Sequence, residues 1–592
     1  MKKIYKYLLM TIVVSSTMFY SCETFELENT VSPNGLSPDQ ASADLLLNTI
    51  QLDYWRSVET FNNTNGELAR IDYFFGRNYF ADLTPAALNG PWNRLYSGMI
   101  PDIANIESLN SADNDLSFHI GISKVMQAHV MMLLVDSLGD IVFSQANNPT
   151  EFPNPTVDDD QDVYNAALAL LDEARTLLAG ASVGSATDLY YGGDADKWIK
   201  LANTLKMRAD LTVGNYAAVV AATDLIESTA DDMEFKFGTN ELQPDNRHPD
   251  YESDYRSDGA NIYSNSWLMN KMIGENGDEG PDNDPRRRYY FFRQNWRTPG
   301  NYALIEDVLG LIGSPGDVLA FSSDGNGETL QCSLQEIPTH YQFTPDAEIW
   351  CSNKLGYWGR VHGNDEGIPP DNFTRTARGV YPAGGSFDAV ADAFPWIGEG
   401  INIEQQVGLG KGGGGAGIEA IMLNSYVHFM QAEASLALGD AAGAAAHMEA
   451  GMRASIAKVM SFGALDGSAD MSQAPDAAAV EAFVTLILDE FNAAPMTSGV
   501  DGSGFPLEND KMDILSEQYF VTLFGGSADA FNFIRRTGYP RTISRNIEPD
   551  PGLFPRTLQY PGNEVSANPN ILQRTDLNTK VFWDQGVTSP AN

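Results

Sequence analysis

Residues 160–178 read DQDVYNAALALLDEARTLL, and residues 195–209 read ADKWIKLANTLKMRA. In each segment the apolar residues recur at spacings of four and three, the period of one face of an α-helix. The faces are Tyr164, Leu168, Leu171, Ala174 and Leu178, then Trp198, Leu201, Leu205 and Ala209. A run of Asp before the first segment suits a helix start. The two segments therefore predict a pair of helices that pack as a hairpin.

Further helices follow later in the chain. One amphipathic face is formed by Ile418, Ile421, Met422, Ser425, Phe429, Ala432 and Leu436. An alanine-rich helix is expected from Ala441 to about Val459, and another from about Asp510 to Phe524. Small residues in antiparallel helix pairs allow close packing, as in tetratricopeptide-type hairpins, although the strict repeat consensus is absent. We predict a mainly α fold, with a helical scaffold at about 39–234 and 418–530.

The middle of the chain, about 235–417, has a different composition. It is rich in Gly, Pro, Asp and Asn and has no long helical period. Long irregular segments in large proteins are usually either functional or disordered. Its many aromatic residues argue against disorder. We predict a single domain at 39–592, in which 235–417 is a loop-rich, aromatic-rich insert that forms a ligand face and 531–592 is irregular.

The N-terminus has the order of a secretory signal. Three lysines precede an apolar run from Leu8 to Val14, and Ser21 comes directly before Cys22. Phe19 stands where lipoprotein signals usually carry Leu. We predict that residues 1–21 are a signal peptide, that Cys22 takes a diacylglycerol, and that 22–38 form a tether. An ordinary signal with a chance cysteine is the alternative. Several acyl chains anchor far more strongly than one.

Composition limits the partners. The formal charge is −42, from 79 acidic and 37 basic residues, and such a field repels phosphate backbones. No nucleic-acid partner is expected. We also expect no later stretch to have the roughly 20 apolar residues that span a membrane. Cys332 and Cys351 are far enough apart for a disulfide, which export would allow to oxidise, but the sequence does not decide whether they pair.

The sequence gives little sign of catalysis. Gly180–Gly184 matches the nucleophile-elbow pattern, yet a helix and not a strand is expected before Ser182. Gly408–Gly413 lacks the βαβ context of a dinucleotide site. In so acidic a chain no carboxylate pair stands out as a glycosidase acid and nucleophile. We predict that the protein is not an enzyme and has no organic cofactor.

One short segment raises the question of a metal. Asp324, Asn326 and Glu328 alternate as oxygen ligands do around Ca²⁺. They lack the rest of a calcium loop, and a plain polar turn is the competing interpretation.

Several segments together resemble signatures of the SusD/RagB family, in particular its SusD-like outer-membrane lipoproteins. They are Val135–Ser144, Asp194–Lys200, Asn283–Arg286, Gly359–Asn364, Gly367–Asp371, Gly379–Gly385, Phe429–Ala434 and Phe533–Pro540. Each is weak alone, but in this order they cover most of the chain after Cys22. The resemblance implies tetratricopeptide-like helix pairs packed against a loop-rich ligand face.

The resemblance also implies a role. SusD-like proteins bind oligosaccharides, or in some members peptides, and pass them to a SusC-like TonB-dependent transporter in the outer membrane. The acidic residues Glu23, Glu26 and Glu28 resemble a surface-export tag, which implies that the protein faces the cell exterior. A glycan is the leading ligand and a peptide the alternative. A surface hydrolase is the third hypothesis, from another class.

Aromatic residues of the insert are the candidate ligand contacts. A Trp ring covers the flat C–H face of a sugar, while a few well-placed polar groups bond its hydroxyls. Trp296 and Trp350 lie outside the shared motifs and are favoured. Trp358, Arg360 and His362 lie in or beside such a motif. These three either bind ligand or hold an irregular loop in place.

Overall fold

Helices form the scaffold of the computed structural model, which describes residues 42–274, 283–294, 357, 359–363, 375–390, 407–502, 504–546, 548 and 550–589. The predicted hairpin is α7 (Asp160–Leu178) and α8 (Ala195–Thr212), which pack against each other. Asp159 caps α7, because its side chain accepts hydrogen bonds from the backbone N–H groups of Gln161 and Asp162. Asp194 caps α8 in the same way. Ser182 lies in the turn between the two helices, as expected.

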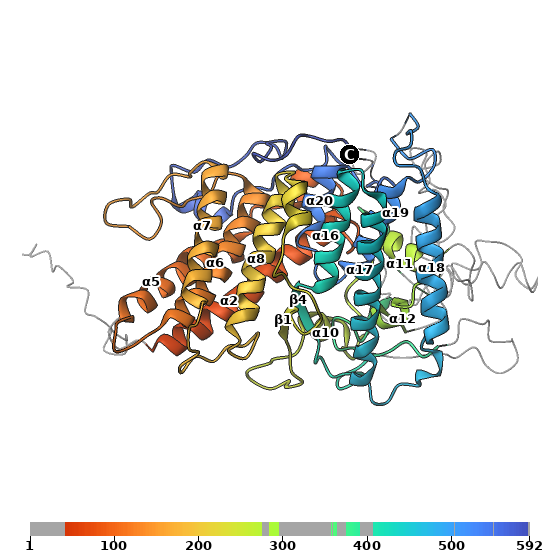
Figure 1. The fold of residues 1–592 in the computed structure, drawn as a ribbon, viewed down its shortest axis with the longest axis horizontal. Helices are drawn as coiled ribbons and strands as arrows, with labels where there is room; N and C mark the ends of the chain where they lie inside the picture. The colour runs from red at the N-terminus through yellow and green to blue at the C-terminus, as the bar shows by residue number, and fades with distance from the viewer. Residues whose placement is uncertain are drawn as a thin grey trace, which may run out of the picture. The chain divides into compact units, whose positions relative to one another are not determined.

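The N-terminal half has further helices, which lie to one side of this hairpin or against it (Figure 1). They are α2 (Ala43–Leu68), α3 (Tyr79–Asp82), α4 (Asn89–Asn93), the π-helix η2 (Arg94–Met99), α5 (Ile100–Leu109), α6 (Ser117–Leu138) and α9 (Tyr216–Ala221). Helix α6 lies between α2 and α7 and packs against both. The N-terminal half is therefore a layer of neighbouring helices with α6 inside.

Helix α6 corrects one expectation from the sequence. By length and composition it is apolar enough to cross a membrane, and in the part of the chain that the structure describes it is the one helix that is. All of its residues except Ser117 are buried inside the protein. A helix that is hydrophobic on every side is typical of a protein core as well as of a membrane span. Its burial places α6 in the core.

The C-terminal half contributes a second group of helices. They are α16 (Asn424–Ala437), α17 (Ala441–Ser461), the 3₁₀ turns η4 (Phe462–Leu465) and η5 (Met471–Gln473), α18 (Ala477–Ala493), α19 (Lys511–Thr522), α20 (Ala530–Thr537) and α21 (Gly562–Ala567). Helices α16 and α17 form a close pair, and α18 and α19 pack beside α17. Contacts of α16 with α8 and α9 join the two groups. The mainly α fold is thus confirmed.

The sequence predicted a helix that begins at Ile418, and this predicted start is wrong. Ile418–Met422 is strand β4, and α16 begins only at Asn424. All five residues of β4 are buried, and the strand pairs antiparallel with β1 (Met233–Lys236), with Lys236 opposite Ile418. Pairing with a segment nearly two hundred residues away overrides the local helical spacing.

The middle region is loop-rich where it is described, as predicted, but it contains short elements. These are α10 (Pro249–Asp254), α11 (Ser266–Ile273), α12 (Arg287–Tyr290), β2 (Phe291–Arg293) and β3 (Thr376–Arg378). Strands β2 and β3 pair antiparallel, with Phe291 opposite Arg378. This small sheet holds β3 in place beside α10.

The C-terminal segment after α20 is mostly irregular and packs on the N-terminal helices. The Trp583 indole Nε1 donates a hydrogen bond to the buried Asp136 carboxylate at 3.0 Å. Arg574 donates to the backbone carbonyl of Leu138, and Phe582 N donates to Asp160 at 2.7 Å. These hydrogen bonds hold the C-terminal segment against α6 and α7.

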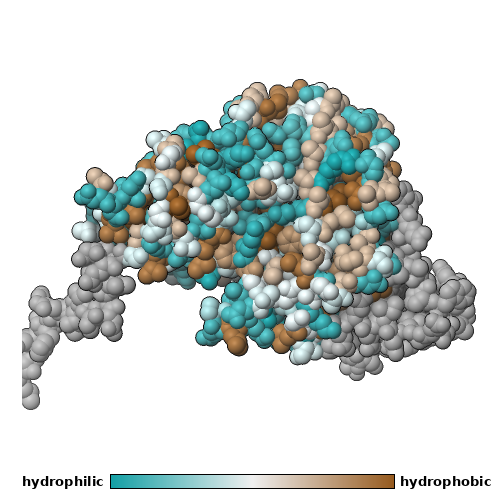
Figure 2. Space-filling view, turned by 60° about the horizontal axis from the view of Figure 1, so that its bottom comes forward, coloured by the Kyte–Doolittle hydropathy of each residue, from teal (hydrophilic) through white to brown (hydrophobic). Residues whose placement is uncertain are grey.

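The exposed surface is mixed in character. On the face in Figure 2, hydrophilic and hydrophobic residues are interspersed over the described part of the chain. The exposed apolar side chains include Phe75 at 56% and Phe80 at 41% exposure. Single exposed apolar residues are normal for soluble surfaces.

Candidate functional site

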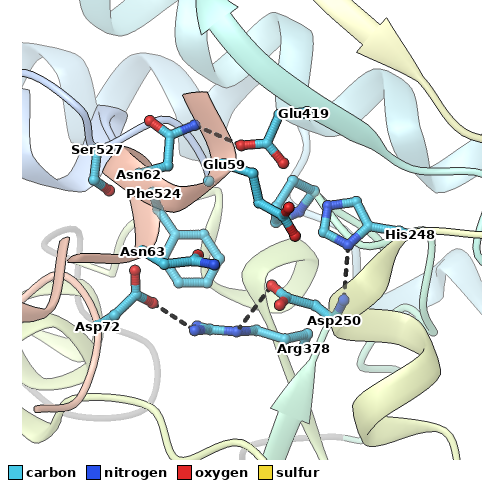
Figure 3. Close-up of a pocket in the computed structure, with 12 residues that line it drawn as sticks. Glu59, Asn62, Asn63, Asp72, His248, Asp250, Arg378, Glu419, Phe524 and Ser527 are labelled. Atoms are coloured by element: carbon cyan, nitrogen blue, oxygen red, sulfur yellow. Dashed lines mark hydrogen bonds and ion pairs between the residues drawn. The ribbon is translucent and has the colours of Figure 1, made fainter. Parts of the chain in front are cut away.

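A polar pocket lies where α2, α10, β3, β4 and the turn after α19 meet (Figure 3). Its lining residues are Glu59, Asn62, Asn63, Asp72, His248, Asp250, Arg378, Pro382, Glu419, Phe524, Gly525 and Ser527. Segments hundreds of residues apart supply these side chains, so the pocket exists only in the folded chain.

Helix α2 supplies three polar side chains to the pocket. Glu59, Asn62 and Asn63 are three and four positions apart, so they share one face of the helix. Asn62 is buried, and its amide Nδ2 donates to the Glu419 carboxyl Oε1 at 2.6 Å and to the Ala420 carbonyl at 3.1 Å. Its Oδ1 accepts from Ala528 N at 2.8 Å. Asn62 therefore ties α2 to β4 and fixes one oxygen of Glu419.

Arg378 closes the other side of the pocket. Its Nη2 forms an ion pair with Asp72, and its Nε lies 3.6 Å from an Asp250 carboxyl oxygen. Its guanidinium carbon lies 4.8 Å from the centre of the Phe524 ring. Figure 3 shows Arg378 between the two aspartates. The single Arg378 guanidinium thus interacts with two carboxylates of the pocket lining, those of Asp72 and Asp250.

The turn after α19 contains a glycine that packs closely against another residue of the pocket lining. Gly525 has a φ of +83°, and a Cβ there would lie 2.6 Å from the Pro382 ring. Both the left-handed conformation and the close approach exclude other residues without a shift of the backbone.

Burial changes the acidity of the pocket. Desolvation, with repulsion from Asp250, raises the pKa of Glu59 to about 7. Desolvation, with repulsion from Glu59, raises the pKa of Glu419 well above its ordinary value. Burial also lowers the pKa of His248, so its ring favours the neutral form. The Nδ1 of His248 accepts from the Asp250 backbone N–H at 3.1 Å.

The chemistry available to this pocket is that of an acceptor-rich recess. Its cavity is about 30 Å³, room for one or two waters. In the described part of the chain no group of three His, Cys, Asp or Glu residues has an arrangement that could hold a metal ion. A small polar group fits here, whereas a sugar ring does not.

A second, larger cavity of about 280 Å³ lies between α7, α8 and the C-terminal segment. Its lining mixes aromatic, aliphatic and polar side chains: Gln161, Tyr164, Asn165, Leu168, Lys206, Ala209, Asp210, Val213 and Phe582. Its size is near the lower end of small-molecule sites, about 300 Å³.

Two of the residues predicted to bind ligand, Arg360 and His362, are buried. The Arg360 backbone donates to Ser264 O and accepts from Ser266 N, both at 2.9 Å, and its guanidinium carbon lies 4.5 Å from the centre of the Tyr263 ring. His362 stacks on Phe74 with 5.0 Å between ring centres, and its Nε2 lies 3.0 Å from the Tyr79 hydroxyl. This geometry favours the alternative in which both residues hold the loop, and ligand contact by them stays a prediction.

The remaining predicted site residues lie outside the described residues. They are Cys22, Trp296, Trp350 and Trp358, the calcium candidates Asp324, Asn326 and Glu328, and the cysteines Cys332 and Cys351. Their predicted roles stay predictions.

Sequence reasoning missed the polar pocket. One signal was present: Glu419 interrupts the apolar run of β4, Ile418–Met422, and a charged residue in such a run is rarely buried without a function or a partner. The other members come from four separate segments, and no local pattern joins them.

Comparisons with known proteins complete the description. The profile of the SusD-like family described as starch-binding and associating with the outer membrane matches residues 36–328. A comparison with curated protein sequences gives no match.

Solved structures share the fold at low identity. A SusD/RagB family protein from Bacteroides thetaiotaomicron is 17% identical with a TM-score of 0.59, over 92% of this chain and 100% of that one. A chitin-binding protein is 19% identical with a TM-score of 0.57, over the same shares of the two chains. A SusD homolog from Bacteroides uniformis is 18% identical with a TM-score of 0.55, again over 92% and 100%. With the helix-rich scaffold and the profile match, these likenesses agree with the resemblance in the sequence, and the chain belongs to the SusD-like family.

Proposed function

We propose that this protein binds oligosaccharide or polysaccharide nutrients at the cell surface and delivers them to a SusC-like TonB-dependent transporter. The observation that carries the proposal is the match of residues 36–328 to a family described as starch-binding and associated with the outer membrane. A chitin-binding protein among the similar structures supports a carbohydrate ligand.

The proposed anchor is lipid on Cys22, with the chain facing the cell exterior. The support is the basic and apolar start, Ser21 before Cys22, and the acidic residues that follow. A surface anchor keeps a binding protein close to its transporter, which raises the effective concentration of each for the other.

The proposed ligand contacts are Trp296 and Trp350, with Trp358 as a further candidate. Loops on a rigid scaffold are where binding residues concentrate. Arg360 and His362 would then act by holding their own segment, 359–363, in place.

Calorimetric titration with a panel of glycans tests this assignment. By analogy with bases that stack on aromatic residues, Trp296→Ala and Trp350→Ala should each lose about 1–3 kcal/mol of binding free energy, roughly five- to hundredfold in affinity. Their melting temperatures should stay near that of the wild type. Wild-type affinity in both variants, or loss of binding through unfolding alone, would show that the contacts lie elsewhere.

The same panel separates the alternatives. A peptide library that binds where no glycan does would favour the peptide role within the same family. Product chromatography should show intact glycans, since members of this family bind and do not cleave. Turnover that a single Asp or Glu substitution abolishes would favour the hydrolase.

A further inference from the structure

Arg378 in the polar pocket has hydrogen-bond donors that its described neighbours leave unused. Its side chain is 6% exposed, and its Nη2 donates to Asp72. Its Nε lies 3.6 Å from an Asp250 carboxyl oxygen, which is too far for a hydrogen bond. Within the described residues neither Nε nor Nη1 has a hydrogen-bond acceptor, although both atoms are buried. The pocket therefore contains a buried cation with donor nitrogens that lack an acceptor.

An unused donor on a buried guanidinium group is unfavourable. Arg stays protonated in proteins, and its N–H groups have a fixed planar geometry. A buried N–H that has lost its water and gained no acceptor destabilises the folded state, and more so when the group is charged. Arg378 is nevertheless held in place by the ion pair with Asp72 and by its contact with the Phe524 ring. A guest that brings an acceptor would satisfy the unused donors.

These donors belong to the lining of a small cavity. Arg378 is one of the lining residues, and Figure 3 shows its guanidinium group along one edge of the enclosed space. The cavity is about 30 Å³, which is room for one or two waters and so for a group of about two heavy atoms. At the rim Asn63 is exposed, and the Asp250 side chain is 28% exposed. A short arm of a larger molecule can therefore enter while the rest of the molecule stays in solvent.

Acceptors line another side of the cavity. In Figure 3 the carboxyl group of Glu59 lies between those of Glu419 and Asp250, and Glu59 interacts electrostatically with both. A carboxyl group keeps an accepting oxygen whether it is ionised or protonated. A guest therefore meets donors at Arg378 and acceptors at Glu59 and its neighbours.

A hydroxyl group matches this arrangement better than an ion does. An anion would accept from Arg378, but the carboxylates of Asp72 and Asp250 already balance the charge of that side chain. An ammonium group only donates, so it would leave the Arg378 donors unpaired. A hydroxyl group has one donor and two acceptor lone pairs, so it can accept from Arg378 and donate to a carboxyl oxygen at the same time.

The apolar part of the lining suits the carbon that carries such a hydroxyl. Phe524 and Pro382 line the cavity together with the polar groups. A hydroxyl directly on a sugar ring would bring the ring with it, whereas a hydroxymethyl arm extends beyond the ring by a single carbon. We propose, on the basis of the proposed glycan ligand, that the pocket holds the hydroxymethyl arm of a hexose unit. Arg378 Nη1 donates to the hydroxyl of the arm, and the hydroxyl donates to Glu59.

This assignment narrows the class of glycan. Hexose polymers that are linked through their ring hydroxyls keep the arm free, so a unit of such a polymer can place it in the pocket. Pentoses lack the arm, and hexoses that are linked through the arm have no free hydroxyl on it. The ligand is therefore a hexose glycan with free hydroxymethyl arms.

NMR titration of the full chain with glucose, 6-deoxyglucose and xylose tests the proposal. 6-Deoxyglucose keeps the carbon of the arm without its hydroxyl, and xylose lacks the whole arm. In saturation-transfer spectra the arm protons of glucose should receive the strongest saturation, because they contact Phe524. Glucose should bind roughly tenfold or more tightly than either analogue, because an analogue without the hydroxyl leaves the polar groups of the site unpaired.

Two variants locate the arm. Arg378→Lys keeps the positive charge but removes the planar set of donors, and Glu59→Met keeps a side chain of similar length without the carboxyl acceptor. Each should abolish the preference for glucose over 6-deoxyglucose. Arg256→Lys and Glu508→Met, at exposed positions outside the pocket, are the matched controls and should retain it. Glu59 is only partly buried, so its variant keeps the test valid if Arg378→Lys fails to fold.

Three results would overturn the proposal: equal binding of glucose and 6-deoxyglucose, no binding of any of the three sugars, or a preference for glucose that both variants retain. These results are separate from those for the nutrient role. Glycan binding that depends on Trp296 and Trp350, with no preference for glucose, leaves the proposed function standing and removes this site. A preference for glucose without binding of any glycan in the panel does the reverse.

Discussion

Trp198 illustrates how one side chain organises its surroundings. It is fully buried, its ring makes edge-on contacts with Tyr190 and Tyr191, and its Nε1 donates to Asp188 at 2.9 Å. Asp188 also accepts backbone N–H groups of the turn before α8. The side chain therefore joins the helix to the turn that precedes it.

Trp198→Ala should destabilise the protein without a direct effect on ligand. Removal of a buried Trp typically costs about 3–5 kcal/mol, because both transfer free energy and a cavity are involved. Chemical denaturation measures the loss. Trp198→Phe is the control and should lose less, since it keeps part of the packing although it gives up the hydrogen bond to Asp188. A Trp198→Ala variant as stable as the wild type would contradict the burial described for α8.

Glu419 gives a prediction about pH. Its pKa is raised in the folded protein, mainly by burial, so between the ordinary value of 4.5 and the raised value the folded state holds a proton that the unfolded state has lost. Stability therefore falls as pH rises through this window. Glu419→Gln should therefore be more stable than the wild type at pH 8, and the difference should be larger there than at pH 5.

The comparison is made by denaturant unfolding at pH 5 and pH 8 in a buffer free of amines. At pH 5 the two proteins should differ little, since Glu419 is protonated when folded. Parallel stability curves for variant and wild type across this range would mean that Glu419 does not titrate as described.

The burial of Trp198 follows the sequence prediction, because Trp198 lies on the apolar face of a segment with a clear helical period. The polar pocket could not be predicted in this way. Asn62 and Glu419 are 357 positions apart, and only the folded chain pairs them. In a sequence alone, a polar residue that is buried cannot be told apart from one at the surface until its partner is known.

At the scale of elements, the pair α16 and α17 depends on a glycine. A Cβ at Gly451 would lie 2.9 Å from two carbons of the Phe429 ring and 3.3 Å from His428 Cβ. Phe429 is itself fully buried, so it has little freedom to move. The small residues of α17 thus allow the close approach that the sequence predicted for this pair.

Gly451→Ala should therefore destabilise the protein, although Ala normally favours a helix over Gly by roughly 0.5–1 kcal/mol. Overpacking in a core typically costs about 1–3 kcal/mol, which outweighs the gain in propensity. Thermal melts check the sign. Ala446→Gly, at an exposed position of the same helix, serves as the control and should lose only the propensity difference. A higher melting temperature for Gly451→Ala would show that α16 and α17 separate easily.

Helix positions were predictable where a long amphipathic period exists, as in α7, α8 and α17. Strand β4 was not, because Ile418, Ile421 and Met422 have helical spacing and the partner strand β1 lies far away in sequence. Helix α6 shows no single apolar face, since it is apolar all round and lies inside the protein. Amphipathic patterns reveal helices at the edge of a core better than helices within it.

At the scale of the whole molecule, the proposed attachment to the membrane depends on Cys22. Cys22→Ala should leave the protein soluble or as an uncleaved precursor, because no thiol remains to take lipid. Membrane fractionation and mass spectrometry of the N-terminus measure the outcome. Cys332→Ala is the control and should fractionate like the wild type. An unmodified Cys22 in the wild type would refute the anchor.

The mainly α scaffold and the family followed from the sequence, but the ligand contacts did not. Family-wide motifs such as Gly359–Asn364 include buried structural residues, as Arg360 and His362 show. In the sequence, a Trp or Arg that would contact ligand has the same kind of surroundings as one that holds a loop. For that reason the sequence predicted the family more readily than the contacts.

The end of α6 has a consequence for the order in which contacts can form. Trp583 and Arg535 donate to the Asp136 side chain and backbone carbonyl, and Arg574 reaches the carbonyl of Leu138. These partners lie 399 to 447 positions further along the chain. The polar groups at the end of this buried helix are therefore satisfied only by long-range contacts, which require closure of very large loops of the chain.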